Sequence, residues 1–135
     1  MKKANFQKGF WNYLNSCRNS YGFEFCGIGE VSVYIFVAHL AVNQSTGLAT
    51  ADGLVLPSNN STNTKLTTEL QKKSGSSWVK EYSWEASGEG TDTVYTSSLR
   101  YVVKGTYRVV VTAKIYSSSG SLLETQDITS KEVTY

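Results

Sequence analysis

The sequence predicts an all-β fold, an Ig-like antiparallel β-sandwich of about seven strands. In residues 104–116, apolar side chains from Tyr107 to Ile115 alternate with polar ones, and this period of two is typical of a half-buried strand. Charged residues make up only 18% of the chain, against about 25% in an ordinary domain, and the chain has nine Tyr but one Pro. This composition favours strands over helices. Turn signals recur roughly every 8–12 residues over much of the chain, as in Ig-like sandwiches.

The chain length of 135 residues suits one domain, which would bury roughly two-thirds of its unfolded surface without metal or disulfide support. We expect residues 20–135 to form this domain and residues 1–19 to form an N-terminal extension, either a short helix or irregular. The extension contains apolar residues at helical spacing, namely Phe6, Phe10, Trp11, Leu14 and Cys17.

The sequence of the first half of the domain predicts two strands and a loop. Alternating aromatic residues in Tyr21–Phe25 predict a strand, and the glycines around Ile28 predict a turn. The run Val31–Val42 is apolar on both faces, so it predicts a central strand that is covered on both sides or nearly so. Residues 43–63 are mostly polar and contain the only proline, Pro57, which predicts a long loop or an insertion.

The second half predicts five further strands separated by short turns. They are Thr64–Lys73, Trp78–Glu85, Thr91–Val103, Thr106–Tyr116 and Leu122–Thr134. The third of them is expected to break near Ser97 and Ser98. Tyr107 stands two residues beyond Gly105 at the start of its strand, a position that predicts a corner tyrosine whose hydroxyl bonds back to the chain.

The charge distribution argues against a nucleic-acid partner. Four of the thirteen basic residues precede Glu24, whereas all eleven acidic residues lie from Glu24 onward, so the folded part is not a basic surface. The sequence has no Cys-x-x-Cys motif and no Cys/His cluster, so no metal site or cofactor is predicted. Cys17 and Cys26 are expected as two free thiols or as one short-loop disulfide if the protein is exported.

The sequence shows no clear signal peptide and no integral membrane segment. Met1, Lys2 and Lys3 resemble the charged start of a leader, but no apolar run follows them, because polar residues are interspersed as far as Ser20. The first long apolar run, Val31–Val42, is too short to span a bilayer and alternates as a strand does.

Candidate catalytic residues are sparse. His39 is the only histidine, so a small hydrolase built on a Ser-His or Cys-His pair would have to use it. It lies within an apolar strand-like run, and the carboxylates at Glu81, Glu85, Glu89 and Asp92 occupy solvated positions. The sequence therefore predicts a protein that is not an enzyme.

The best candidate for binding is an aromatic face formed by Trp78, Tyr82 and Trp84, which alternation places on one side of a strand. Exposed, these rings would form an interaction patch for a protein or a glycan. The competing interpretation is that they belong to the core, as the early-strand tryptophan of Ig domains does.

One stretch also resembles known sandwiches. The segment Gly105-Thr106-Tyr107-Arg108-Val109, followed by the Ser-rich loop at Gly120, is similar to the penultimate strand and loop of PKD-like and fibronectin-III-like domains. With Trp78 and Trp84 upstream, residues 64–135 resemble small uncharacterised secreted proteins of Gram-positive bacteria. The resemblance implies a secreted or cell-surface location. The resulting hypothesis is a non-catalytic module that binds a protein or glycan, with a purely structural envelope or virion module as the alternative.

Overall fold

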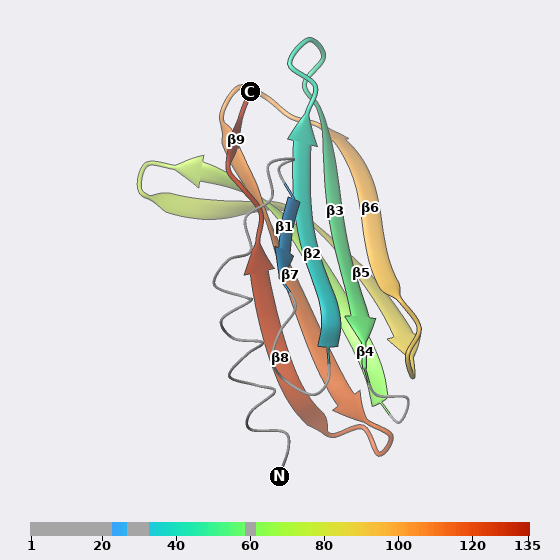
Figure 1. The fold of residues 1–135 in the computed structure, drawn as a ribbon. Coiled ribbons are helices and arrows are strands. Elements are labelled where there is room, and N and C mark those ends of the chain that lie inside the picture. The colour runs from blue at the N-terminus through green and yellow to red at the C-terminus, as the bar shows by residue number, and fades with distance from the viewer. Residues whose placement is uncertain (1–22, 27–32, 59–61) are drawn as a thin grey trace.

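Two antiparallel sheets face each other in the computed structural model, which describes residues 23–26, 33–58 and 62–135 (Figure 1). The first sheet has the strand order β1-β2-β3-β6, formed by Phe23–Cys26, Val33–Val42, Leu48–Pro57 and Val94–Tyr101. The second sheet has the order β5-β4-β7-β8, with β9 also paired to β7. Its strands are β4 (Thr62–Ser74), β5 (Ser77–Glu89), β7 (Thr106–Ser117), β8 (Leu122–Thr129) and β9 (Val133–Thr134).

The strand order confirms the expected antiparallel sandwich. Hairpins join β2 to β3, β4 to β5 and β7 to β8 within a sheet, while the intervening connections cross from one sheet to the other. Strands β2, β3 and β6 thus correspond to strands A, B and E of an Ig-like fold, and β4, β7 and β8 to strands C, F and G. The described residues contain no helix, and so none that could cross a membrane. The extension expected at residues 1–19 lies outside the described part of the chain.

The region 43–63 differs from the loop that the sequence predicts. Leu48–Pro57 is strand β3, which lies between β2 and β6 in the first sheet and buries every second residue. Its buried positions are occupied by Ala49, Ala51, Gly53, Val55 and Pro57. Because three of these side chains are very small and β-propensity is low for Ala and Gly, the alternation is hard to recognise in the sequence. Among the described residues of this region, only the turn around Gly47 and Ser58 lie outside strands, because β4 begins at Thr62.

In the core, small residues of β3 face large residues of the second sheet. The inner face of β3 is lined mainly by Ala and Gly, whereas β4 and β7 contribute fully buried large side chains, among them Leu66, Leu70, Val109, Val111 and Ile115. This complementarity allows the two sheets to approach closely while filling the space between them.

One buried hydrogen bond crosses between the two sheets next to Gly53. Thr96 Oγ1 on β6 donates to Thr68 Oγ1 on β4 at 2.6 Å, and both side chains are buried. Gly53 on β3 makes room for this pair, because a Cβ atom there would collide with Thr68 Oγ1 and lie 3.0 Å from a methyl group of Val111. The contact satisfies both hydroxyls without water.

Tyr107 is the corner tyrosine that its position after the glycine turn predicts. Its ring is buried at the start of β7, and its hydroxyl donates a 2.8 Å hydrogen bond to the carbonyl oxygen of Val103. The bond fastens the β6–β7 connection, which crosses from one sheet to the other, onto the second sheet. Burial and the negative charge of Glu81 raise the pKa of the Tyr107 hydroxyl.

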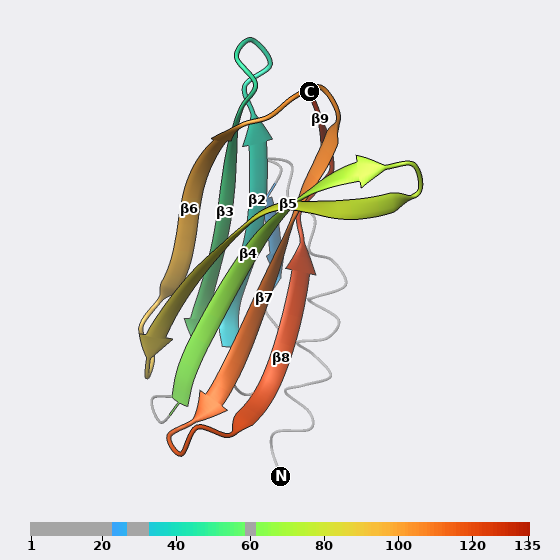
Figure 2. The same cartoon turned by 180° about the vertical axis from the view of Figure 1, so that it is seen from behind.

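The β4–β5 hairpin extends beyond the sandwich as an arm, residues 73–78. Pairing of β4 with β7 ends at Lys72 and Tyr107, while pairing with β5 continues to Ser74 and Ser77. Figure 1 shows the arm leaving the sandwich on the side away from β6, and Figure 2 shows the same arrangement from behind. Nearly all side chains of its tip are exposed to solvent.

We predict that Gly53→Ala destabilises the fold by about 1–3 kcal/mol, because the added methyl group forces the sheets apart or breaks the Thr68–Thr96 bond. Urea denaturation followed by tryptophan fluorescence measures the loss. Thr50→Ala, on the outward face of the same strand, is the control, and we expect a change within about 0.5 kcal/mol for it. In combination with Thr68→Ala, which removes the colliding atom, Gly53→Ala should cost less than it does alone. Strict additivity would show that the collision is not the cause.

We predict that Tyr107→Phe lowers the free energy of unfolding at pH 7 by about 0.5–1.5 kcal/mol, through loss of the bond to Val103. The substitution should also change how the free energy of unfolding falls at alkaline pH. The folded state holds the Tyr107 proton more tightly than the unfolded chain does. The stability that protonated Tyr107 contributes is therefore complete below pH 10 and falls as the pH rises above it.

Urea titrations between pH 7 and 11 measure both effects, with Tyr101→Phe as the control because the Tyr101 side chain is 72% exposed. Wild type should lose stability more steeply above pH 10 than Tyr107→Phe. Equal slopes for the two proteins would contradict the assignment.

Candidate functional site

The three aromatic residues expected to share a face are divided between two faces. Tyr82 and Trp84 lie on the inner face of β5, opposite Leu70 and Thr68 of β4, and their rings stack with centroids 6.2 Å apart. Trp84 packs against the core, whereas Tyr82 is 38% exposed. Trp78 is half-buried and lies opposite Lys73 on the outer face.

A β-bulge at Glu81 causes this division. Tyr82 pairs with Leu70, but the next residue of β4, Gln71, pairs with Lys80, so Glu81 has no partner on β4. One extra residue reverses the face on which all earlier residues of the strand lie. Strict alternation counted along the sequence from Trp78 therefore gives the wrong face, and no residue in Trp78–Trp84 marks the bulge.

A guanidinium group lies over each of two rings of this set, Tyr82 and Trp78. The Arg100 guanidinium on β6 lies 4.1 Å from the centre of the Tyr82 ring. The Arg108 guanidinium on β7 lies 4.2 Å from the ring of Trp78, with Lys73 Nζ at 5.9 Å. Each contact is a cation–π interaction that covers one face of the ring. The face of each ring that the guanidinium covers is thus occupied within the protein itself.

Strand β6 is the least protected edge among the described strands. Within that part of the chain it pairs with β3 alone, through eight consecutive residues without a register shift. Its outward-facing side chains include Tyr95, Leu99 and Tyr101, which are 64%, 62% and 72% exposed. Its only charged residue, Arg100, lies on the inner face over Tyr82. The break expected near Ser97 and Ser98 is wrong, since the strand runs through both residues.

The other described edges each carry a feature that discourages pairing with another chain. Strand β1 has only four residues. Strand β5 contains the Glu81 bulge and several charged residues, and β8 contains Glu124, Asp127 and a register shift of its own. Short length, charge and bulges are the usual means of protecting an edge strand. Strand β6 has none of them on its exposed face.

His39 takes part in a polar ladder across three strands of the first sheet. His39 on β2 lies opposite Asp52 on β3, and Asp52 lies opposite Ser97 on β6. His39 Nδ1 is 2.8 Å from Asp52 Oδ2, and Ser97 Oγ donates a 2.6 Å hydrogen bond to Asp52 Oδ1. In a nucleophilic triad the imidazole stands between the hydroxyl and the carboxylate. Here the carboxylate is in the middle, so the serine proton points to Asp52 and the ladder ties β6 to the sheet.

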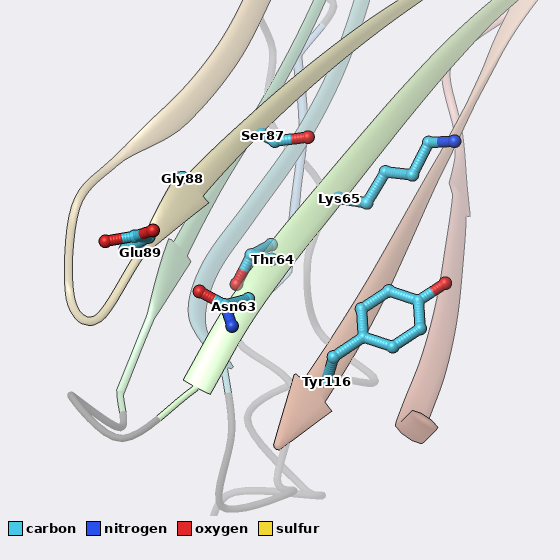
Figure 3. Close-up of a pocket in the computed structure, with 7 residues that line it drawn as sticks. All are labelled: Asn63, Thr64, Lys65, Ser87, Gly88, Glu89 and Tyr116. Atoms are coloured by element: carbon cyan, nitrogen blue, oxygen red, sulfur yellow. The ribbon is translucent and has the colours of Figure 1, made fainter. Parts of the chain in front are cut away.

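An open groove of about 450 Å³ lies where the start of β4 passes between β5 and β7 (Figure 3). It is lined by Asn63, Thr64, Lys65, Ser87, Gly88, Glu89 and Tyr116. Lys65 Nζ forms an ion pair with Glu85 at 3.2 Å. Glu89 is the only carboxylate among the lining residues, so the groove does not assemble the two acids that glycoside hydrolysis requires. None of the expected aromatic site residues borders it.

The class of this protein is assigned from its fold, because the sequence comparisons identify no family. No protein-family model matches the chain, and no curated protein sequence matches it significantly. The described residues also contain no group of three His, Cys, Asp or Glu side chains placed to hold a metal ion. The structure therefore defines an all-β sandwich protein, and the resemblance to secreted Gram-positive proteins stays a prediction.

Proposed function

We propose that this protein is a non-catalytic β-sandwich module that binds protein by adding a strand to β6. The observation that supports the proposal most directly is the long, regular and uncharged outer face of this edge strand. Strand addition gives affinity through main-chain hydrogen bonds and specificity through alternate side chains. Here Tyr95, Leu99 and Tyr101 supply the alternate side chains.

The residues around β6 favour a protein partner over a glycan. Tyr, Trp and Arg are the residue types that contribute most of the energy at protein interfaces, and Tyr82, Trp84 and Arg100 lie together beside the edge. Arg100 is held in place by the Tyr82 ring before any partner arrives, so little side-chain entropy is lost on binding. Trp78 belongs to the arm and is not part of this proposed surface.

Absence of catalysis is part of the proposal and is supported by the order of groups around His39. The Asp52 carboxylate separates His39 from Ser97, so the imidazole does not receive the serine proton. Location at the cell surface or outside the cell is likewise proposed. It rests on a composition low in charged residues and on the resemblance to secreted sandwich domains.

A strand-addition site predicts that extended peptides bind β6. Peptides selected from a displayed random library on the immobilised protein should alternate in polarity and bind with micromolar affinity. Leu99→Lys places a charge on the exposed edge and should weaken the selected peptides about tenfold or more. Fluorescence anisotropy with labelled peptides measures this.

The matched control is Leu123→Lys on β8, because Leu123 is 57% exposed and Leu99 is 62% exposed. Peptide affinity for Leu123→Lys should equal that of wild type. Selected peptides that bind both variants as well as wild type would place the binding surface elsewhere and contradict the proposal.

A further inference from the structure

We infer that the strand that adds to β6 is β6 of a second copy of this chain, paired antiparallel about a two-fold axis next to Ser98. The inference rests on the proposed binding role of β6 and specifies its partner. The resulting dimer has a first sheet that continues from one copy into the other. Such an interface uses the same surface of both copies and closes without exposing a new edge.

A second copy of β6 meets the requirements that β6 sets for an added strand. An added strand has to place apolar side chains next to Tyr95, Leu99 and Tyr101 on the outer face. It also has to avoid a cation opposite Arg100. A second β6 does both, because its outer face is equally apolar and its one cation already lies over Tyr82 of its own copy.

The residues of β6 also favour one register for this pair. In a two-fold antiparallel pair the axis passes between a residue and its own counterpart, so the register is defined by that residue. With Ser98 at the axis, Tyr95 lies opposite Tyr101 of the second copy, and the same pair recurs by symmetry. Aromatic cross-strand pairs are among those that stabilise sheets. Arg100 then lies opposite Thr96 of the second copy, so no like charges face each other.

The neighbouring register is less favourable. With Ser97 at the axis, Tyr95 would lie opposite Leu99 of the second copy, and both aromatic pairs would be lost. The pairing is confined to the strand itself, because Lys104 lies in the connection to the second sheet, where its Nζ is 3.7 Å from the centre of the Tyr135 ring. The register centred on Ser98 is therefore favoured by its two aromatic pairs.

The shape of the molecule leaves room for this pairing. The arm extends on the side of the sandwich away from β6, so it does not obstruct the approach of another copy (Figures 1 and 2). One strand pair with adjoining side chains buries less surface than the ~1,200 Å² of a standard stable interface. We therefore expect a reversible dimer with a micromolar or weaker dissociation constant.

Sedimentation velocity of the full chain over a range of concentrations tests the inference. Wild type should change from monomer to dimer as the concentration rises towards millimolar. Leu99→Lys should raise the dissociation constant about tenfold or more, and Leu123→Lys should leave it unchanged. Both leucines are exposed, so neither change should prevent folding.

A pair of charges tests the register. Tyr95→Lys alone and Tyr101→Glu alone each remove the two aromatic pairs, so each should weaken the dimer about fivefold. In the Ser98 register the double variant places opposite charges at both of these positions, so it should associate more tightly than either single variant at low salt. Failure of the double variant to recover would overturn the Ser98 register.

The outcomes separate this inference from the proposed function. A wild-type chain that stays monomeric, but whose selected peptides still depend on Leu99, overturns self-pairing and leaves strand addition to a different protein. A dimer that is insensitive to Leu99→Lys overturns self-pairing through β6, whatever the peptides show. Loss of both the dimer and the peptide binding in wild type overturns both proposals.

Discussion

The close approach of the two sheets at Gly53 is the constraint on which the rest of the structure depends. Glycine at this position lets the Thr68–Thr96 hydrogen bond form between the sheets, with the methyl groups of Val111 packed beside it. Because β3 contributes only small side chains there, the large residues of β4 and β7 fill the core from the other side. Thr96 lies on β6, so this same contact holds the edge strand against the second sheet. The interior is thus closed around a few positions that tolerate almost no added volume.

A core closed in this way confines binding to the edges and the outer faces. Two local features decide which edge is available. The bulge at Glu81 interrupts β5, turns Trp78 to the outer face and brings a charge beside the corner tyrosine. Strand β6 has no such interruption, and Ser97 at its centre is fastened to Asp52 of the neighbouring strand. The ladder that includes His39 therefore has a structural consequence: it keeps the middle of the edge in register.

Much of the fold follows from the sequence, because local alternation and a glycine turn are local signals. The β7 strand and the bond of Tyr107 to the preceding loop are of this kind, and both are present. The features that were missed depend on contacts between distant residues. Strand β3 is stabilised by close packing of Ala and Gly against another sheet, and the bulge at Glu81 is defined only by its pairing with β4. The aromatic site was divided for the same reason, since face assignment beyond a bulge requires the register of the partner strand.

In the proposed role, strand β6 would serve both stability and recognition. Residues that alternate along a strand point to opposite faces, so Val94 and Thr96 belong to the core while Tyr95 and Leu99 remain at the surface. We therefore expect substitutions on the two faces to have separable effects: changes at Thr96 would act on the contact between the sheets, and changes at Leu99 on the proposed binding of another strand. A protein that only needed to be stable would gain from a charge at Leu99, because an uncharged edge invites pairing with other chains. The large apolar side chains on this exposed face are therefore better explained by a partner than by the fold.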